Sequence, residues 1–277
     1  MKIKNVSSNF ITQSAFVKLK NSDWLERQRV AGKIVAKTLS MLEKLVSEGT
    51  NKSLLELDKL GDEFIRDSGC IPTFFQYKGF PNSVCISVNR QLVHGVATDY
   101  KLKDGDVISF DLGATYNGAI ADSALTCIWG EPKSKGHVEL IAATKEALVR
   151  GIGAVKVGNR IGAIGDAIYR YSKDKGFKVI ETYGGHGIDT APDGTGIPHA
   201  QPFVSNKSDP SKGIKIQPGL TIAIEPMLLP YSSQLTTKTG SDGWTVYTEE
   251  IGAHEEHTLF VKEDGVVEII TERNNIG

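Results

Sequence analysis

Residues 111–122 have the sequence DLGATYNGAIAD, and the Asn-Gly dipeptide at its centre favours a tight turn between two strands. The segment therefore predicts a β-hairpin. A four-residue loop over 115–118 would place Asp111 directly opposite Asp122 on the neighbouring strand. Like charges directly opposed destabilise a sheet, so this pair needs a compensating cation, which a metal ion supplies. In the alternative, the hairpin slips by one residue and both carboxylates face water.

Four segments around this hairpin have the apolar spacing of helices. They cover residues 23–48, 53–68, 138–149 and 161–175. The first two begin with a capping-box pattern, in which Asp23 is followed by Glu26 and Ser53 by Glu56. The expected stop signals are Gly49, Gly69, Gly151 and Gly176.

Short β-branched runs predict strands between and after these helices. They cover residues 84–88, 107–112, 119–127, 220–224, 257–261 and 266–271. Because the helices come in pairs and strict β-α-β alternation is missing, we expect an α+β fold with an antiparallel sheet. Residues 1–20 have no clear period, and we interpret them as an N-terminal arm before a single catalytic domain at 21–277.

A weak internal repeat links the two strand-rich regions. In one, Gly105 starts an apolar run that ends six positions later at Asp111, and in the other Gly219 stands in the same relation to Glu225. A pair of predicted helices precedes each region. The repeat is compatible with a duplicated α+β unit. The alternative is chance, since a glycine turn followed by a strand recurs in many sheet proteins.

Composition and charge narrow the classes of function. The chain has 277 residues with 32 Lys+Arg against 33 Asp+Glu, without a basic block or an acidic tail, so nothing indicates a nucleic-acid or membrane partner. The 3 cysteines form no CxxC pair or disulfide framework, and no apolar run is long enough to span a bilayer. Since the start of the chain also lacks a signal-peptide core, we expect a cytoplasmic protein.

Further carboxylates and histidines are candidates for a site. Glu225 ends an apolar run, where it is either exposed at a strand end or a buried ligand. The period of a strand puts Glu255 and Glu256 on opposite faces, and nothing local tells which one points inward. His186 lies between glycines, which let the backbone fold tightly and present the imidazole. Two more histidines, in predicted loops, are His94 and His199.

Taken in order, these residues resemble the metal site of the type I methionine aminopeptidases. The ordered set is Asp111, Asp122, His186, Glu225 and Glu256. Matching phrases surround it: YKGFP at 77–81, SVCIS at 83–87, HG at 94–95, DGD at 104–106, DLG at 111–113, GGHG at 184–187, EP at 225–226, DGW at 242–244 and EHT at 256–258. The resemblance covers nearly the whole chain from Asp23 onward. It implies the pita-bread fold, a pseudo-two-fold antiparallel sheet with flanking helix pairs, which would account for the repeat.

The resemblance also implies a reaction, the hydrolysis of the first peptide bond by a hydroxide that bridges two divalent metal ions. The ordered set would hold ions of cobalt, manganese, iron, nickel or zinc. Because its ligands are mostly oxygen atoms, it does not resemble the zinc sites that are built from cysteine thiolates. Glu225 would also shuttle the proton of the water. His199 would steady the carbonyl oxygen, and His94 would contact the scissile amide or the leaving nitrogen.

The implied substrate is a nascent polypeptide, met at the ribosome, whose N-terminal methionine precedes a small second residue. The side chains expected around the methionine are Tyr77, Phe80, Cys85 and Trp244. Aromatic and sulfur surfaces suit an unbranched thioether, although each of these residues could instead be an ordinary core or rim side chain. We expect the protein to act as a monomer.

Two segments depart from the family pattern. Residues 188–198 make the stretch before His199 longer, and their Pro-Asp-Gly sequence predicts a turn at the mouth of the site that alters access or second-residue preference. His199 is therefore the catalytic assignment that most needs a structure. Residues 96–99 have the sequence VATD where relatives commonly have proline, and we attach no mechanism to this difference.

Three rival classes remain at this level. An X-Pro aminopeptidase or dipeptidase shares the fold and ligand types, but it generally carries a sizeable N-terminal domain, for which about 20 residues before the first helix leave no room. A type II methionine aminopeptidase would have a long insertion between Glu225 and Glu256, where only 30 residues lie. A non-catalytic pita-bread binding protein would usually have lost ligands, and all five are retained here.

Overall fold

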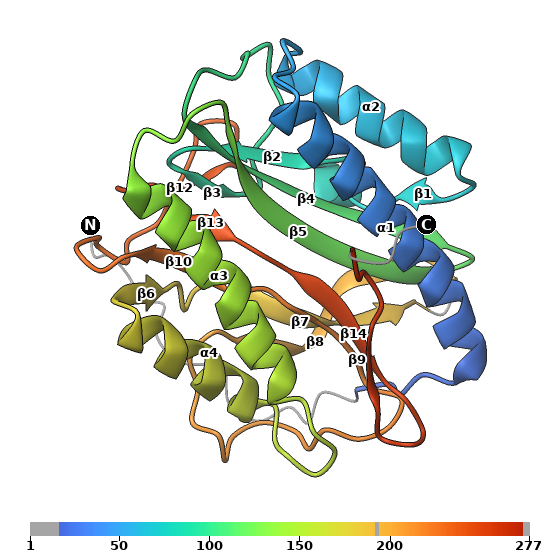
Figure 1. The fold of residues 1–277 in the computed structure, drawn as a ribbon. Helices are drawn as coiled ribbons and strands as arrows, with labels where there is room; N and C mark the ends of the chain where they lie inside the picture. Colours follow the sequence, from blue (N-terminus) through green and yellow to red (C-terminus); the bar gives the residue numbers. More distant parts are fainter. Residues whose placement is uncertain (1–16, 192–193, 274–277) are drawn as a thin grey trace, which may run out of the picture.

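The computed structural model describes residues 17–191 and 194–273 (Figure 1). Most of the predicted N-terminal arm therefore lies outside the described residues. The helices are α1 (Ser22–Ser47), α2 (Leu54–Asp67), the short 3-10 helix η1 (Tyr77–Gly79), α3 (Lys135–Gly153) and α4 (Gly162–Asp174). Within these ranges, none of the helices is both long and apolar enough to cross a membrane.

The first half of the fold packs two helices on a long hairpin. Its strands are β1 (Ile71–Pro72), β2 (Cys85–Val88), β3 (Gln91–Val93), β4 (Asp106–Tyr116) and β5 (Ala119–Trp129). β4 pairs antiparallel with β1, β2 and β5. Helix α1 packs across β4 and β5, and the core between them includes the fully buried Leu39, Phe110 and Leu125.

The second half repeats this plan with its own core. Its strands are β6 (Phe177–Val179), β7 (Gly184–Thr190), β8 (Gly196–Ser205), β9 (Thr221–Ile224), β10 (Met227–Pro230), β11 (Lys238–Thr239), β12 (Val246–Tyr247), β13 (Ala253–His254), β14 (His257–Val261) and β15 (Val267–Ile269). The main sheet has the strand order β15-β14-β9-β7-β8. Helices α3 and α4 pack against each other, and the hydrophobic core of this half includes Ala147, Ile168 and Ile222. Figure 1 shows α1 and α3 lying across the strands of the two halves. The predicted α+β class with antiparallel sheets and helix pairs is confirmed.

The register of the central hairpin differs from the prediction. β4 and β5 pair Asp111 with Ala124 and Gly113 with Asp122, so the two aspartates are diagonal neighbours and do not face each other directly. The reason is the turn, which consists of Asn117 and Gly118 alone, both with positive φ, in place of a four-residue loop. Because the difference is two residues, both carboxylates stay on one face of the sheet, and the slip that would expose them does not occur.

The ends of the helices are partly as predicted. The capping box of Ser53 with Glu56 is present at the start of α2. The proposed box at Asp23 is wrong, because α1 begins one residue earlier and its N-cap is Asn21, whose side chain accepts a hydrogen bond from the Trp24 amide. Gly151 does not stop α3, which continues to Gly153. The other three predicted stops follow their helices with positive φ, namely Gly49, Gly69 and Gly176.

On both sides of the predicted turn before His199, the extra residues belong to paired strands. β7 and β8 pair as far as Thr190 with Gly196. The Thr190 hydroxyl donates a hydrogen bond to the carbonyl of Gly118, so this hairpin rests on the turn between β4 and β5. Residues 192–193 of the predicted Pro-Asp-Gly turn lie outside the described residues. Because the additional residues extend the paired strands, His199 still lies near His186.

Candidate metal centre

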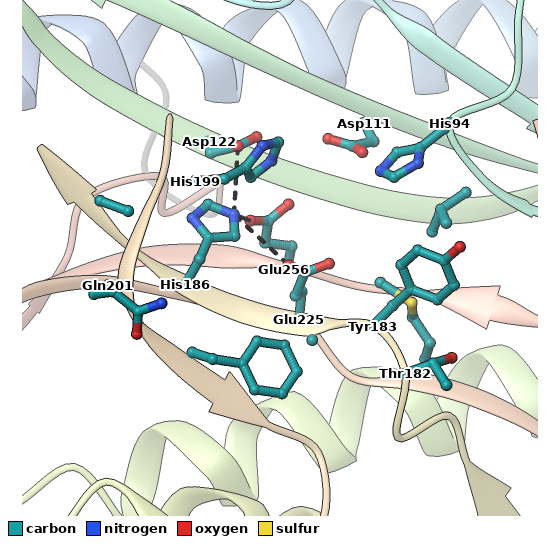
Figure 2. Close-up of a pocket in the computed structure, with 15 residues that line it drawn as sticks. His94, Asp111, Asp122, Thr182, Tyr183, His186, His199, Gln201, Glu225 and Glu256 are labelled. Carbon is teal, nitrogen blue, oxygen red and sulfur yellow. Dashed lines mark ion pairs between the residues drawn. The ribbon is translucent and has the colours of Figure 1, made fainter. Parts of the chain in front are cut away.

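The five residues of the ordered set converge between the two halves of the fold (Figure 2). Asp111 and Asp122 come from β4 and β5, His186 comes from β7, Glu225 directly follows β9, and Glu256 directly precedes β14. Ligand atoms of His186, Glu225 and Glu256 all lie within 4.8 Å of one another, and so do those of Asp111, Asp122 and Glu256. Glu256 belongs to both groups, so its carboxylate lies where it could bridge two cations.

The spacing of these atoms fits a cation. His186 Nε2 lies 3.8 Å from Asp122 Oδ2, 3.6 Å from Glu225 Oε1 and 3.8 Å from Glu256 Oε1. Metal–ligand distances of about 2.0–2.2 Å put two ligands of one ion roughly 3–4 Å apart. The chemistry of the donor set, four carboxylates and one imidazole, suits hard or borderline divalent ions.

Burial makes this cluster costly without a cation. Within the described residues, Asp111 Oδ1, Asp122 Oδ1 and Glu256 Oε1 are buried and have no hydrogen-bond partner. Burial and the neighbouring carboxylates raise the pKa of Asp122 to about 8, and they raise the pKa of Asp111 and Glu256 well above their ordinary values. Buried unpaired charges are strongly unfavourable. A divalent ion would pair with these oxygens and remove the penalty.

The structure also separates the two adjacent glutamates. Glu256 points into the cluster, whereas Glu255 lies on the other side of the strand, where it accepts a hydrogen bond from the Thr126 amide. Arg273 and Lys145 approach the Glu255 carboxylate at 3.4 and 4.0 Å. Both glutamates are buried, so burial alone does not distinguish them. Only Glu256 is placed to act as a ligand.

The glycines beside His186 have a different role from the predicted one. His186 lies in β7, and neither Gly185 nor Gly187 has a positive φ, so no tight turn is present. Instead, neighbouring strands approach them closely. A Cβ on Gly187 would lie 2.0 Å from the carbonyl oxygen of Gln201, and one on Gly185 would lie 2.2 Å from that of Ala223. Glycine is required because the backbones touch.

We expect Gly187→Ala to destabilise the protein by about 1–3 kcal/mol, because the added methyl group must push the β8 backbone away. Chemical denaturation with and without a divalent cation measures the change. The matched control is Gly153→Ala at the end of α3, where a Cβ meets nothing within 4 Å, so its stability should equal or exceed that of wild type. Equal midpoints for Gly187→Ala and wild type would contradict this account.

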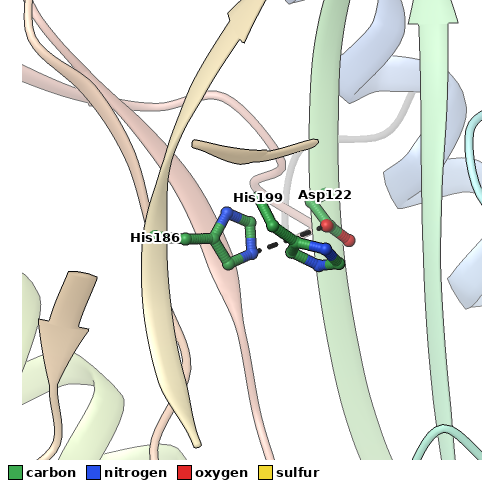
Figure 3. Close-up of side chains that lie close together, drawn as sticks. All are labelled: Asp122, His186 and His199. Atoms are coloured by element: carbon green, nitrogen blue, oxygen red, sulfur yellow. Dashed lines mark ion pairs between the residues drawn. The ribbon is translucent and has the colours of Figure 1, made fainter. Parts of the chain in front are cut away.

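His199 and His94 both lie at the site. Figure 3 shows the His199 ring beside His186 and Asp122, and the centroids of the two imidazoles are 4.6 Å apart. A nitrogen of His199 lies within 4.8 Å of ligand atoms of both neighbours. Desolvation and the adjacent His186 lower the pKa of His199, so its ring is neutral near pH 7 and can donate one hydrogen bond. His94, half-buried with φ of 56°, meets the Tyr183 ring edge to face, with 5.8 Å between the ring centroids.

We expect His199→Ala to lower kcat/KM for peptide hydrolysis by about 10²–10³-fold, the usual cost of losing one donor to a developing oxyanion. Steady-state kinetics measures the loss. His137→Ala is the control, because His137 belongs to α3 and lines neither of the two cavities at the centre. An unchanged kcat/KM for His199→Ala would show that His199 has no catalytic role.

An apolar cavity of about 170 Å³ adjoins the carboxylates. Its lining includes all four residues that the sequence assigned to it, Tyr77, Phe80, Cys85 and Trp244. The Phe80 and Trp244 rings meet edge to face at 5.4 Å, and Cys85 lies directly opposite Asp111 in the β2–β4 pair. Asp111, His94 and His199 also line the cavity. A side chain held here would therefore end beside the candidate metal centre.

Sequence reasoning also missed residues of the site, among them Phe74 and His254. Phe74 lines the apolar cavity and stacks on His199 with 6.2 Å between ring centroids. His254 is buried, and its Nε2 lies 3.3 Å from Glu225 Oε2. His254 stands two residues before Glu256, and strand alternation could have placed both on one face. Nothing local distinguishes Phe74 from an ordinary core residue.

Comparisons with known proteins agree on one family. A family model described as metallopeptidase family M24 matches residues 26–263. A curated methionine aminopeptidase of Mycoplasma capricolum is 40% identical over 257 residues, which cover 92% of this chain and 98% of that protein.

Solved structures agree in fold. The crystal structure of methionine aminopeptidase from Rickettsia prowazekii has a TM-score of 0.84 at 31% identity and covers 93% of this chain and 100% of that one. An Xaa-Pro dipeptidase from Bacillus anthracis has a TM-score of 0.69 at 23% identity, and the match covers 92% of this chain but 62% of the dipeptidase. The second likeness concerns the fold alone.

Proposed function

The chain belongs to metallopeptidase family M24, and on that premise we propose that it is a methionine aminopeptidase that removes N-terminal methionine before a small second residue. The observation that carries the proposal is the apolar cavity beside five converging ligand groups, because it offers a place for one side chain next to the hydrolytic centre. The fold is the pita-bread fold shared with the structural relatives. Relatives that carry the same activity support the choice of substrate.

Two divalent ions would be held by the ordered set, in which Glu256 belongs to both groups of ligand atoms. The orphaned buried oxygens of Asp111, Asp122 and Glu256 support this assignment. When bound, the ions supply Lewis acidity, which makes water a nucleophile near neutral pH. Cobalt, manganese, iron, nickel and zinc are all compatible with the donor set, because cellular availability decides among them.

Glu225 would accept the proton of the attacking water. Burial alone would raise the pKa of Glu225, but the contact with His254 and the nearby His186 outweigh it and lower that pKa below its ordinary value. The carboxylate is therefore ionised near pH 7, as a general base must be. The two histidines approach its two oxygens at 3.3 and 3.6 Å, which fixes the orientation of the carboxylate.

The other side chains would position the substrate. The methionine side chain would occupy the apolar cavity, where its thioether meets aromatic rings and the Cys85 sulfur. His199 would donate a hydrogen bond to the carbonyl oxygen as negative charge develops on it. His94, which lines both cavities, would contact the nitrogen of the scissile amide.

The direct test is an assay of Met-Ala-Ser after chelator treatment and restoration with each of the five metals. We expect release of free methionine only with metal, and little release from peptides with leucine in the second position. Activity that chelation leaves intact would contradict the proposal. Preferential cleavage of X-Pro peptides in parallel would instead assign the chain to the dipeptidase branch of the family.

Further features of the protein are proposals of the same kind. We propose one catalytic domain over 21–277, action as a monomer on nascent chains in the cytoplasm, and encounter with them at the ribosome. The nearly balanced charge of −1 supports recognition that is local to one chain terminus. Size-exclusion chromatography with light scattering and cell fractionation test the assembly and the location.

A further inference from the structure

We propose that Phe203 forms a subsite for the third residue of the substrate and favours an apolar side chain there. The proposal rests on the proposed function and extends it to the sequence beyond the scissile bond. Phe203 would thus make the enzyme select among polypeptides that share methionine and a small second residue.

Phe203 lies on the open edge of the main sheet. β8 is an outer strand of that sheet and pairs with β7 on one side. Three residues of β8 are exposed, namely His199, Gln201 and Phe203. All three line one cavity of about 270 Å³ that also contains the candidate metal centre. The Phe203 side chain, 48% exposed, thus offers an apolar surface inside the catalytic cavity.

The position of Phe203 is tied to the metal centre by strand pairing. Phe203 is the direct partner of His186 in the β7–β8 pair, and Cα atoms of such partners lie about 4.5–5.5 Å apart. A Cβ added at Gly184 would come within 3.2 Å of Phe203 Cζ, so the phenyl ring lies close over the β7 backbone at that glycine. The ring is therefore supported from below by backbone and presents its other surface to the cavity.

The two adjoining cavities indicate the direction in which a bound peptide would extend from the candidate metal centre. His94, Asp111 and His199 line both of them. If methionine fills the apolar cavity, the rest of the chain must leave through the larger one. An extended chain advances about 3.3 Å per residue, so its third residue lies roughly 7 Å beyond the first. Figure 2 shows Gln201, which also belongs to β8, on the side of the cavity away from Asp111 and His94.

The experiment compares kcat/KM for Met-Ala-Leu and Met-Ala-Gly with the metal-restored enzyme. For wild type we expect a preference for Met-Ala-Leu of about tenfold, since a hydrophobic contact of this size discriminates by roughly that factor. In Phe203→Ala the ratio should fall toward one. In Phe203→Arg the preference should move to Met-Ala-Glu, because the new guanidinium attracts a carboxylate. Ratios within one variant do not depend on how much of it is folded.

Val138→Ala is the matched control. Val138 is likewise exposed and apolar, at 45%, but it belongs to α3 and lines neither cavity, so this variant should keep the wild-type ratio. A wild type that cleaves both peptides equally, or a Phe203→Ala variant that keeps the wild-type ratio, overturns the subsite and leaves the proposed function standing. If wild type releases no methionine from either peptide, whichever of the five metals is supplied, the proposed function and the subsite fail together.

Discussion

Asp122→Asn is expected to lower kcat/KM for Met-Ala-Ser by roughly 10³-fold or more, because losing a charged ligand weakens a metal centre that supplies several kcal/mol of transition-state stabilisation. The same change should stabilise the metal-free protein. Asp122 is 1% exposed, and its pKa of about 8 reflects repulsion by Glu225 in addition to burial. With this pKa the metal-free native state holds a proton on Asp122 at pH 7 that the unfolded chain has released, and a neutral amide of nearly equal shape removes that cost.

Activity and thermal unfolding of the chelated protein, measured on the same preparation, test this prediction. The expected combination is an inactive enzyme with a higher Tm than chelated wild type and a smaller rise in Tm on addition of metal. Asp166→Asn is the control, because Asp166 lies on α4 and pairs with Arg170 at the surface. An active Asp122→Asn enzyme, or one whose chelated form is less stable than wild type, would argue against a metal site at these carboxylates.

Removal of metal is expected to make stability fall as pH rises from about 6.5 to 8.5. A carboxyl group whose folded pKa is raised keeps its proton in the native state after the unfolded chain has lost it, so stability declines with pH in this window. Asp122, with its pKa of about 8, titrates there, whereas Glu255, whose pKa burial raises to about 7, contributes only at the lower end of the window. Below pH 6.5 the buried histidines oppose it, because their lowered pKa values make stability rise with pH up to their ordinary value of 6.5.

A loss on the order of 5–10 °C in Tm is expected across this window for the chelated protein, from roughly 1.4 kcal/mol for each pH unit and titrating group. A saturating divalent cation should largely abolish the slope, since it replaces the protons on the carboxylates. Differential scanning fluorimetry at several pH values, with chelator or with metal, gives both curves. Parallel curves would mean that the carboxylate cluster binds no cation. The chelated Asp122→Asn protein should show a shallower slope than chelated wild type.

The sequence singled out the five candidate ligands, which the structure brings together, because each lies in a locally recognisable phrase. Asp111 and Asp122 flank a strong turn signal. His186 lies between glycines, which do mark the site, although they are needed for the close approach of neighbouring strands and not for a tight turn. The turn length was misjudged by two residues. That error left the predicted face intact, because side chains alternate with a period of two. A register error of one residue would have placed the two carboxylates on the opposite face of the sheet, away from the site.

Other parts of the site depend on contacts between distant segments. Phe74 and Phe203 have no local signal, and the only local signal for His254 is its spacing of two residues from Glu256. His254 meets Glu225 across a gap of 29 positions in the sequence, and Phe203 meets His186 through the β7–β8 pair. The pairing of Asp189 with Ile197 and of Thr190 with Gly196 likewise had no local signal, because it depends on how β7 and β8 are brought together.

The sequence by itself indicated most element types, the paired helices and the five residues that we propose as metal ligands, because these follow from local periodicity, turn chemistry and ordered phrases. Only the tertiary structure decided that Glu256 and not Glu255 faces the cluster, that His199 reaches His186, and that two cavities meet at Asp111. The physical reason is that these facts depend on strand register and on packing between halves of the chain. Both are set by non-local pairing, which local residue patterns do not specify.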